Sequence, residues 1–189
     1  MAQVKTDVAS DDDAVMARVA ARDALAFRLL IDAHASRAHR VAWRMLADGV
    51  EAEDVAQEAM LRLWSHAASW RAGGPGVGAW VTRVAMNLCL DRLRRRKFHS
   101  DEDVPERIDE SEAADDMIDS DRIRAMTVSA VQALPERQRA AIILTYYEEQ
   151  PNIMAAATLD MNIKAFESLL LRARAALRSA LGPAREAAR

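Results

Sequence analysis

The chain has 189 residues, 51% of them apolar, and only six glycines, a composition that favours an all-α protein. Its single cysteine, Cys89, excludes an internal disulfide and any cysteine-cluster metal site, and we expect it to be a buried core residue. No run approaches the roughly 18 uncharged apolar residues that span a bilayer, and the start lacks a signal-peptide core, so we expect a cytoplasmic protein without membrane insertion.

The net charge of −3 is unevenly distributed. Residues 101–121 carry eleven Asp and Glu against one Arg, a net of −10, so the rest of the chain sums to +7. This acidic stretch is too poor in apolar residues to build a core. We therefore predict helical domains at 1–97 and 121–182, an acidic flexible linker at 98–120 and a tail at 183–189. The basic remainder keeps nucleic acid open as a partner.

Apolar spacing predicts four helices in the first domain. Three aspartates, 11–13, suit the start of a short first helix. A second helix fits 23–47, with Gly49 expected to end it. Its stripe is Phe27, Ile31, His34, Ala38, Val41 and Met45.

A third helix is predicted from about Glu51 to His66. Its core stripe is Val55, Ala56, Ala59, Met60, Leu63 and Trp64, which leaves Asp54, Gln57, Glu58 and Leu61 on the outward side. The glycine-rich RAGGPGVG then predicts a flexible connection. A fourth helix follows from about Val77 to Lys97 and buries Val77, Val81, Val84 and Leu88.

The second domain is predicted to begin with a helix from about Asp121 to Leu134, and Pro135 opens the next. A short helix, NIMAAATL, then a turn at 160–162 and a long helix from about Ile163 to Leu181 have the outline of a helix-turn-helix. The long helix is expected to bury Phe166, Leu170, Ala173 and Leu177 and to present Lys164, Glu167, Ser168, Leu171 and Arg172 outward.

The sequence offers little for catalysis. No two of the four histidines stand three or four apart on one helix face, and no Walker-type phosphate loop is present. Asp54 and Glu58 lie one helical turn apart but project outward, whereas carboxylate metal sites in bundles project inward. Their face fits either solvent or a protein partner, because Leu61 is an apolar anchor ringed by polar groups.

A basic and aromatic stripe follows the fourth helix. Trp80, Arg83, Asn87 and Arg94 recur at spacings of three, four and seven, and RLRRRK at 92–97 adds positive charge that includes Arg95 and Arg96. Guanidinium groups bind phosphates, and an indole ring can stack on an unpaired base. The stripe favours single-stranded or melted nucleic acid.

These motifs together resemble the extracytoplasmic-function (group IV) sigma factors of bacterial RNA polymerase. The matches, in order, are AEDVAQEAMLRLW, AWVTRVAMNLCLDRLRRR, the acidic tether, ALPERQRAAIILTYYE and a helix-turn-helix that ends in SLLLRARAALR. The resemblance covers about residues 11–181. It implies sigma domains two and four, no enzymatic activity, no cofactor and no metal.

The resemblance also implies partners and site residues. The face of Asp54, Gln57, Glu58 and Leu61 would dock on the β′ clamp helices of core RNA polymerase. In domain two, Arg83, Asn87 and the loop around Trp70 and Arg71 would capture a flipped promoter base, and Arg94, Arg95 and Arg96 would grip the DNA backbone. Domain four would read the minus-thirty-five element and touch the β flap, and an anti-sigma factor is implied.

The chain departs from the family pattern in domain four. Asp160 stands where the turn commonly has glycine, Glu167 stands where a basic residue is common, and Leu169 and Leu171 make the helix unusually apolar. Two other interpretations remain open at this point. One is a stand-alone helix-turn-helix DNA-binding regulator, and the other is a carboxylate-bridged metal enzyme.

Overall fold

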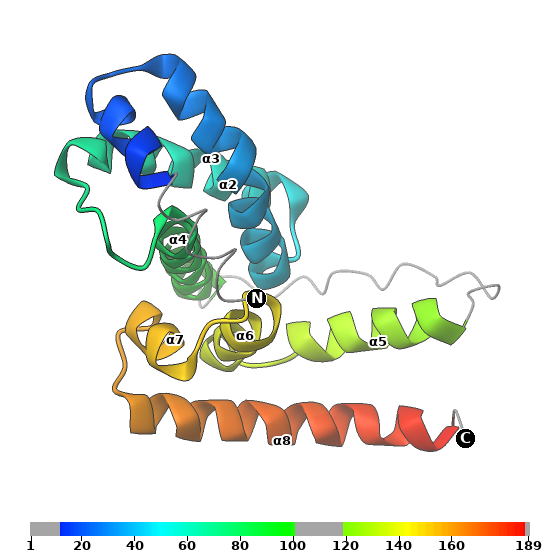
Figure 1. The fold of residues 1–189 in the computed structure, drawn as a ribbon. Coiled ribbons are helices and arrows are strands. Elements are labelled where there is room, and N and C mark those ends of the chain that lie inside the picture. The colour runs from blue at the N-terminus through cyan, green and yellow to red at the C-terminus, as the bar shows by residue number, and fades with distance from the viewer. Residues whose placement is uncertain (1–11, 101–118, 188–189) are drawn as a thin grey trace. The chain divides into compact units, whose positions relative to one another are not determined.

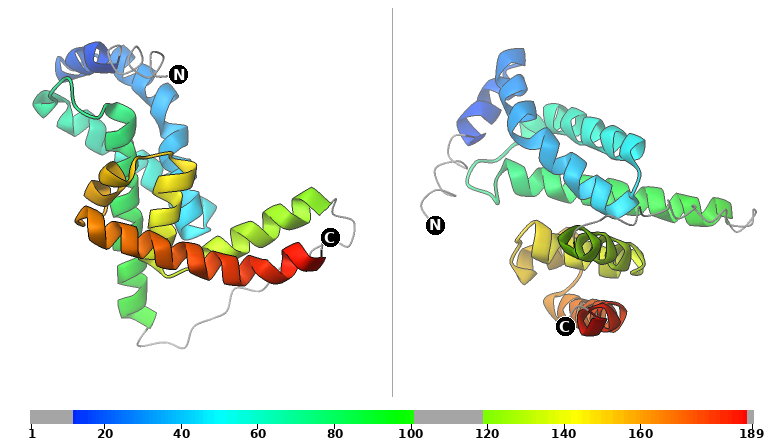
Figure 2. Two further views of the ribbon diagram at one scale, coloured as in Figure 1. Left: turned by 60° about the horizontal axis from the view of Figure 1, so that its bottom comes forward. Right: turned by 90° about the vertical axis from the view of Figure 1, so that its right-hand side faces the viewer.

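The computed structural model describes residues 12–100 and 119–187, and these ranges contain helices and no strand. The all-α prediction is confirmed. The chain divides into two compact units, Met1–Cys89 and Leu90–Arg189, which we describe one at a time (Figures 1 and 2). Most of the predicted acidic linker lies outside the described residues.

The first unit is a bundle of helices. A first helix at 12–20 precedes α2 (Ala24–Leu46) and α3 (Gly49–His66), which pack along each other. A 3-10 turn, η1 (Ala67–Ser69), and a loop lead into α4 (Val77–Ser100), which crosses the boundary between the units.

A side-chain cap fixes the start of α2. The Asp23 carboxylate accepts hydrogen bonds from the backbone N–H groups of Leu25 and Ala26 and pairs with Arg18 at 2.7 Å. The Ala26 N–H first, and then the Arg18 hydrogen bond, hold the pKa of this carboxyl below its ordinary value. The Asp23 side chain therefore holds the end of the first helix against the start of α2.

Gly49 does not end α2, so that prediction is wrong. The cap is Ala47, in a left-handed conformation with φ 53°, and Asp48 then caps α3 by accepting from the Glu51 N–H at 2.9 Å. Gly49 is the first residue of α3. A Cβ there would lie 3.2 Å from the Trp43 ring, so glycine provides room for the indole.

The core of the first unit follows the predicted stripes over most of their length. Met45, Val55, Leu63, Val81 and Cys89 are fully buried. Four residues expected in the core are only partly buried: Phe27, Ile31, Trp64 and Val84.

Two of those four residues pack against each other at the edge of the bundle. The rings of Phe27 and Trp64 lie with centroids 4.9 Å apart, and the Arg22 guanidinium covers Trp64 at 5.4 Å from the ring centroid. The apolar stripe is thus wider than the core that it helps to build.

From residue 119 to residue 187, the described part of the second unit forms four helices and one π turn. They are α5 (Asp119–Gln132), α6 (Glu136–Ile142), the π turn η2 (Ile143–Tyr147), α7 (Asn152–Thr158) and α8 (Ile163–Ala187). Figure 1 shows α8 running beneath α5, α6 and α7, and it contacts all three.

Helix α8 includes Gly182 and continues six residues beyond its predicted end at Leu181. Phe166, Leu170 and Ala173 are buried as predicted, whereas Leu177 is only partly buried.

Two arginines tie the ends of these helices. Arg137 donates to the Leu159 carbonyl at 2.8 Å, at the end of α7, and Arg139 donates to the carbonyls of Gln132 and Leu134, at the end of α5. Burial lowers the pKa of the Arg139 guanidinium from its ordinary value. These bonds satisfy carbonyls that a helix end leaves without partners.

Within the described residues, no helix combines the length and the apolar character needed to cross a bilayer.

Candidate functional site

The outward face of α3 has the composition predicted for it. Asp54, Gln57 and Leu61 are exposed, and Leu61 leaves 60% of its surface accessible. Glu58 is partly buried and accepts a hydrogen bond from Arg62 at 2.8 Å. An exposed ion pair of this kind contributes little to stability, so Glu58 can exchange its partner at low cost.

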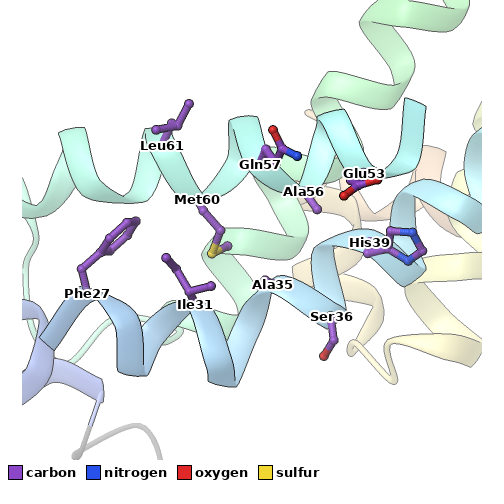
Figure 3. Close-up of a pocket in the computed structure, with 10 residues that line it drawn as sticks. All are labelled: Phe27, Ile31, Ala35, Ser36, His39, Glu53, Ala56, Gln57, Met60 and Leu61. Atoms are coloured by element: carbon purple, nitrogen blue, oxygen red, sulfur yellow. The ribbon is translucent and has the colours of Figure 1, made fainter. Parts of the chain in front are cut away.

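An apolar groove of about 500 Å³ lies beside this face, between α2 and α3 (Figure 3). Phe27 and Ile31 point into it from α2, and Met60 points into it from α3. The full lining is Phe27, Ile31, Ala35, Ser36, His39, Glu53, Ala56, Gln57, Met60 and Leu61.

Sequence reasoning missed this groove because it assigned Phe27 and Ile31 to a closed core. The signal available in the sequence was the number of apolar residues: α2 has a wide apolar stripe, and α3 has one more apolar residue, Leu61, outside its own core stripe.

Three aromatic rings gather where α3 ends and α4 begins. Trp80 stacks on His66 with centroids 5.1 Å apart and an interplanar angle of 14°. Trp70 meets Trp80 edge-on at 6.5 Å and 75°. Ser69 fixes the imidazole, with its hydroxyl 2.9 Å from His66 Nδ1. Trp70 and Trp80, both predicted site residues, therefore belong to one cluster and are partly buried.

The loop at 71–76 is tied to the first helix, although the sequence predicted a flexible connection. The Asp13 carboxylate accepts from Trp70 Nε1 at 2.8 Å and from the Gly73 N–H at 3.0 Å. Arg71 and its neighbours to residue 75 are exposed, while Gly73 and Gly76 have φ angles of 79° and 84° that favour glycine.

Helix α4 presents the predicted stripe. Arg83 is exposed one turn from Asn87, which is partly buried, and the exposed Arg94, Arg95 and Arg96 follow on the later turns. Arg94 also pairs with the Asp91 carboxylate. The side chains offer hydrogen-bond donors along a rigid helix, which suits an extended polyanion.

In the second unit, α8 begins with a side-chain cap, because the Asn162 side chain accepts from the Ala165 N–H at 2.9 Å. The predicted outward residues are all exposed, and they are Lys164, Glu167, Ser168, Leu171 and Arg172. Leu169, by contrast, is buried, so only Leu171 of the two expected leucines adds apolar surface. Asp160 takes φ 50° in the turn, which is the conformation that favours glycine.

Two family models match this chain. Residues 30–99 match the family model "Sigma-70 region 2", and residues 124–177 match "Sigma-70, region 4". The ECF RNA polymerase sigma factor SigL of Mycobacterium tuberculosis is 32% identical over 173 residues, covering 88% of this chain and 96% of SigL. SigW of Bacillus subtilis is 28% identical, covering 82% and 89%.

Two solved structures share the fold at 23% identity. CnrH in complex with the cytosolic domain of CnrY has a TM-score of 0.67, covering 91% of this chain and 97% of CnrH. The sigma factor RpoE in complex with the anti-sigma factor NepR from Bartonella quintana has a TM-score of 0.66, covering 82% and 96%.

The match to region 2 speaks against a stand-alone regulator, for which a helix-turn-helix unit alone would suffice. With both regions present and a relative at 32% identity along almost the whole of SigL, the chain belongs to the extracytoplasmic-function (ECF) sigma factors, which bind core RNA polymerase and direct promoter-specific transcription initiation.

Proposed function

We propose that this sigma factor docks on the β′ clamp helices of core polymerase through Asp54, Gln57, Glu58 and Leu61 of α3. The observation that carries this assignment is Leu61, which is 60% exposed one helical turn beyond Glu58 on a well-packed helix. Carboxylates on such a face accept charge-assisted hydrogen bonds from arginines, and a central apolar anchor adds desolvated contact.

Reversing the charges of Asp54 and Glu58 tests this docking. The double variant D54R/E58R should bind core polymerase at least about ten-fold more weakly, since like charges then face each other across the interface. Binding is measured with labelled sigma factor and purified core enzyme. The control is D32R, a charge reversal of half that size at an exposed position of α2. Equal affinity of D54R/E58R and wild type would refute the assignment.

For promoter melting we propose that Arg83 and Asn87, with the loop around Trp70 and Arg71, receive an unpaired base of the minus-ten element. Trp80 packs beside Trp70 in the aromatic cluster, and Arg94, Arg95 and Arg96 contact the adjoining DNA backbone. The Trp70 indole N–H is already bonded to Asp13, so Trp70 contributes its ring and not a donor. Stacking and phosphate contacts then offset the cost of extruding a base.

For domain four we propose that the N-terminal half of α8 reads duplex DNA of the minus-thirty-five element through Lys164, Ser168 and Arg172. Glu167 is suited to accept from a cytosine amino group, and Leu171 to contact a thymine methyl. The same unit is proposed to touch the β flap.

We infer regulation by an anti-sigma factor, because CnrH and RpoE are both seen with such a partner or with a cytosolic domain bound. The chemistry of RNA synthesis belongs to the polymerase, so we assign this chain no catalytic residue, metal or cofactor. We further propose that the protein is cytoplasmic, because a polymerase partner works where transcription occurs.

A further inference from the structure

The Asp13 carboxylate lies at the junction of two segments that are far apart in sequence. One oxygen accepts from Trp70 Nε1 at 2.8 Å, and the other accepts from the Gly73 N–H at 3.0 Å, so both oxygens are used on one loop. The partners are 57 and 60 residues away along the chain. Local helix chemistry does not require either bond.

We propose that Asp13 is a positioning residue for promoter melting, which holds the loop at 70–76 in the form that receives an unpaired DNA base. The inference rests on the proposed function of that loop. It adds a residue of the first helix to the recognition apparatus, ahead of both matched family regions.

The loop needs such a restraint because its own sequence does not provide one. Residues 71–75 are exposed, and Gly73 and Gly76 have positive φ angles. Glycine has more conformations to lose than other residues, so an untethered loop would have to be ordered by the DNA itself. A loop that is ordered in advance leaves more of the interaction energy for binding.

The same carboxylate sets the orientation of the aromatic cluster. With Nε1 held by Asp13, the Trp70 ring stands edge-on to Trp80, which in turn lies flat on His66. If the hydrogen bond is removed, Trp70 is free to rotate about its side-chain torsions while Trp80 keeps its own stacking partner. Loss of Asp13 should therefore disturb the loop and leave the bundle intact.

The first helix has a separate anchor. Asp12 lies 2.8 Å from His34 Nε2, a side chain buried against the bundle, and Met16 and Val19 are buried in the core. The helix should remain docked when Asp13 is replaced, which makes the loop effect measurable in a folded protein.

The test compares D13N with wild type in the holoenzyme. Asparagine keeps the shape, but its amide nitrogen cannot accept, so at least one of the two bonds is lost. The probe is a duplex with a single-stranded non-template overhang, whose sequence the wild-type holoenzyme has enriched from a randomised pool. D13N should bind this probe about ten-fold more weakly, as expected for loss of hydrogen bonds to a charged acceptor. Its affinity for core polymerase should stay within about two-fold. D32N is the control for loss of one surface charge.

A second variant and a spectroscopic readout separate positioning from folding. W70F removes the donor and keeps an aromatic ring, and combining it with D13N should weaken binding by less than the product of the single effects. In the free protein, the Trp70 indole N–H signal, assigned with W70F, should exchange with solvent faster in D13N.

The outcomes are distinct. Equal probe binding by D13N and wild type, or a parallel loss of affinity for core polymerase, would overturn the role of Asp13. Either result would leave the proposed function of the loop standing. If wild-type holoenzyme enriches no overhang sequence, the proposed function of the loop fails, and this inference fails with it.

Discussion

At the scale of single residues, four non-glycine residues in the described part of the chain have left-handed backbone conformations: Arg22, Ala47, Glu149 and Asp160. Ala47 and Asp160 occupy left-handed conformations with φ 53° and 50°, where a Cβ is unfavourable. Asp160 also explains the departure from the family pattern, since aspartate tolerates this region better than most residues and can replace the usual glycine. Alanine has no polar side chain that stabilises a left-handed conformation, so we expect Ala47 to lower the stability of the fold.

Replacing Ala47 with glycine should raise the free energy of unfolding of the first unit by about 0.5 to 1 kcal/mol, because relief of strain exceeds the added freedom of the unfolded chain. All four tryptophans belong to this unit, so denaturation followed by tryptophan fluorescence reports on it selectively. The control is A33G on the exposed side of α2, which should lower stability by about 1 kcal/mol. A lower stability for A47G would contradict the strain argument.

The limits of prediction from sequence are also visible at this scale. The outward positions of α3 and α8 could be predicted because helical periodicity alone decides them. The Asp13 to Trp70 bond could not, since it joins residues 57 apart in sequence and depends on how the first helix docks. The prediction that Gly49 ends α2 is wrong because the sequence does not distinguish a glycine that caps a helix from one that makes room for a bulky ring.

At the scale of elements, α3 and α4 hold the proposed site residues in fixed positions on their outer faces. The cap at Asp48 fixes the start of α3, and its inner face is buried through Val55 and Leu63, which holds its outer face in position. Helix α4 buries Val81 and Cys89 in the same way. The groove between α2 and α3 could not be predicted, because periodicity tells which side is apolar but not how closely two helices approach.

Arg83 tests the role of α4. If it contacts a phosphate of the unpaired strand, R83A should weaken holoenzyme binding to the single-stranded overhang probe by about ten-fold and reduce the slope of log affinity against log salt by about 0.7. Titrations at several salt concentrations measure both. R28A, an exposed arginine of α2, should leave the slope unchanged. An unchanged slope for R83A would remove the phosphate contact.

At the scale of the whole molecule, we propose that the two units contact different forms of DNA. The first offers an aromatic cluster and Arg83 on α4, suited to unpaired bases, and the second offers the exposed start of α8, suited to a duplex groove. The division into two helical domains could be predicted from charge, because the net of −10 over 101–121 separates two apolar-patterned segments.

Run-off transcription with purified core polymerase tests the central claim most directly. The template is a promoter fragment selected by the wild-type holoenzyme from a random library. Wild-type protein should yield a transcript of defined length, D54R/E58R should yield little because it fails to dock, and D32R should match wild type. A transcript unaffected by D54R/E58R, or none with wild type, would contradict the account.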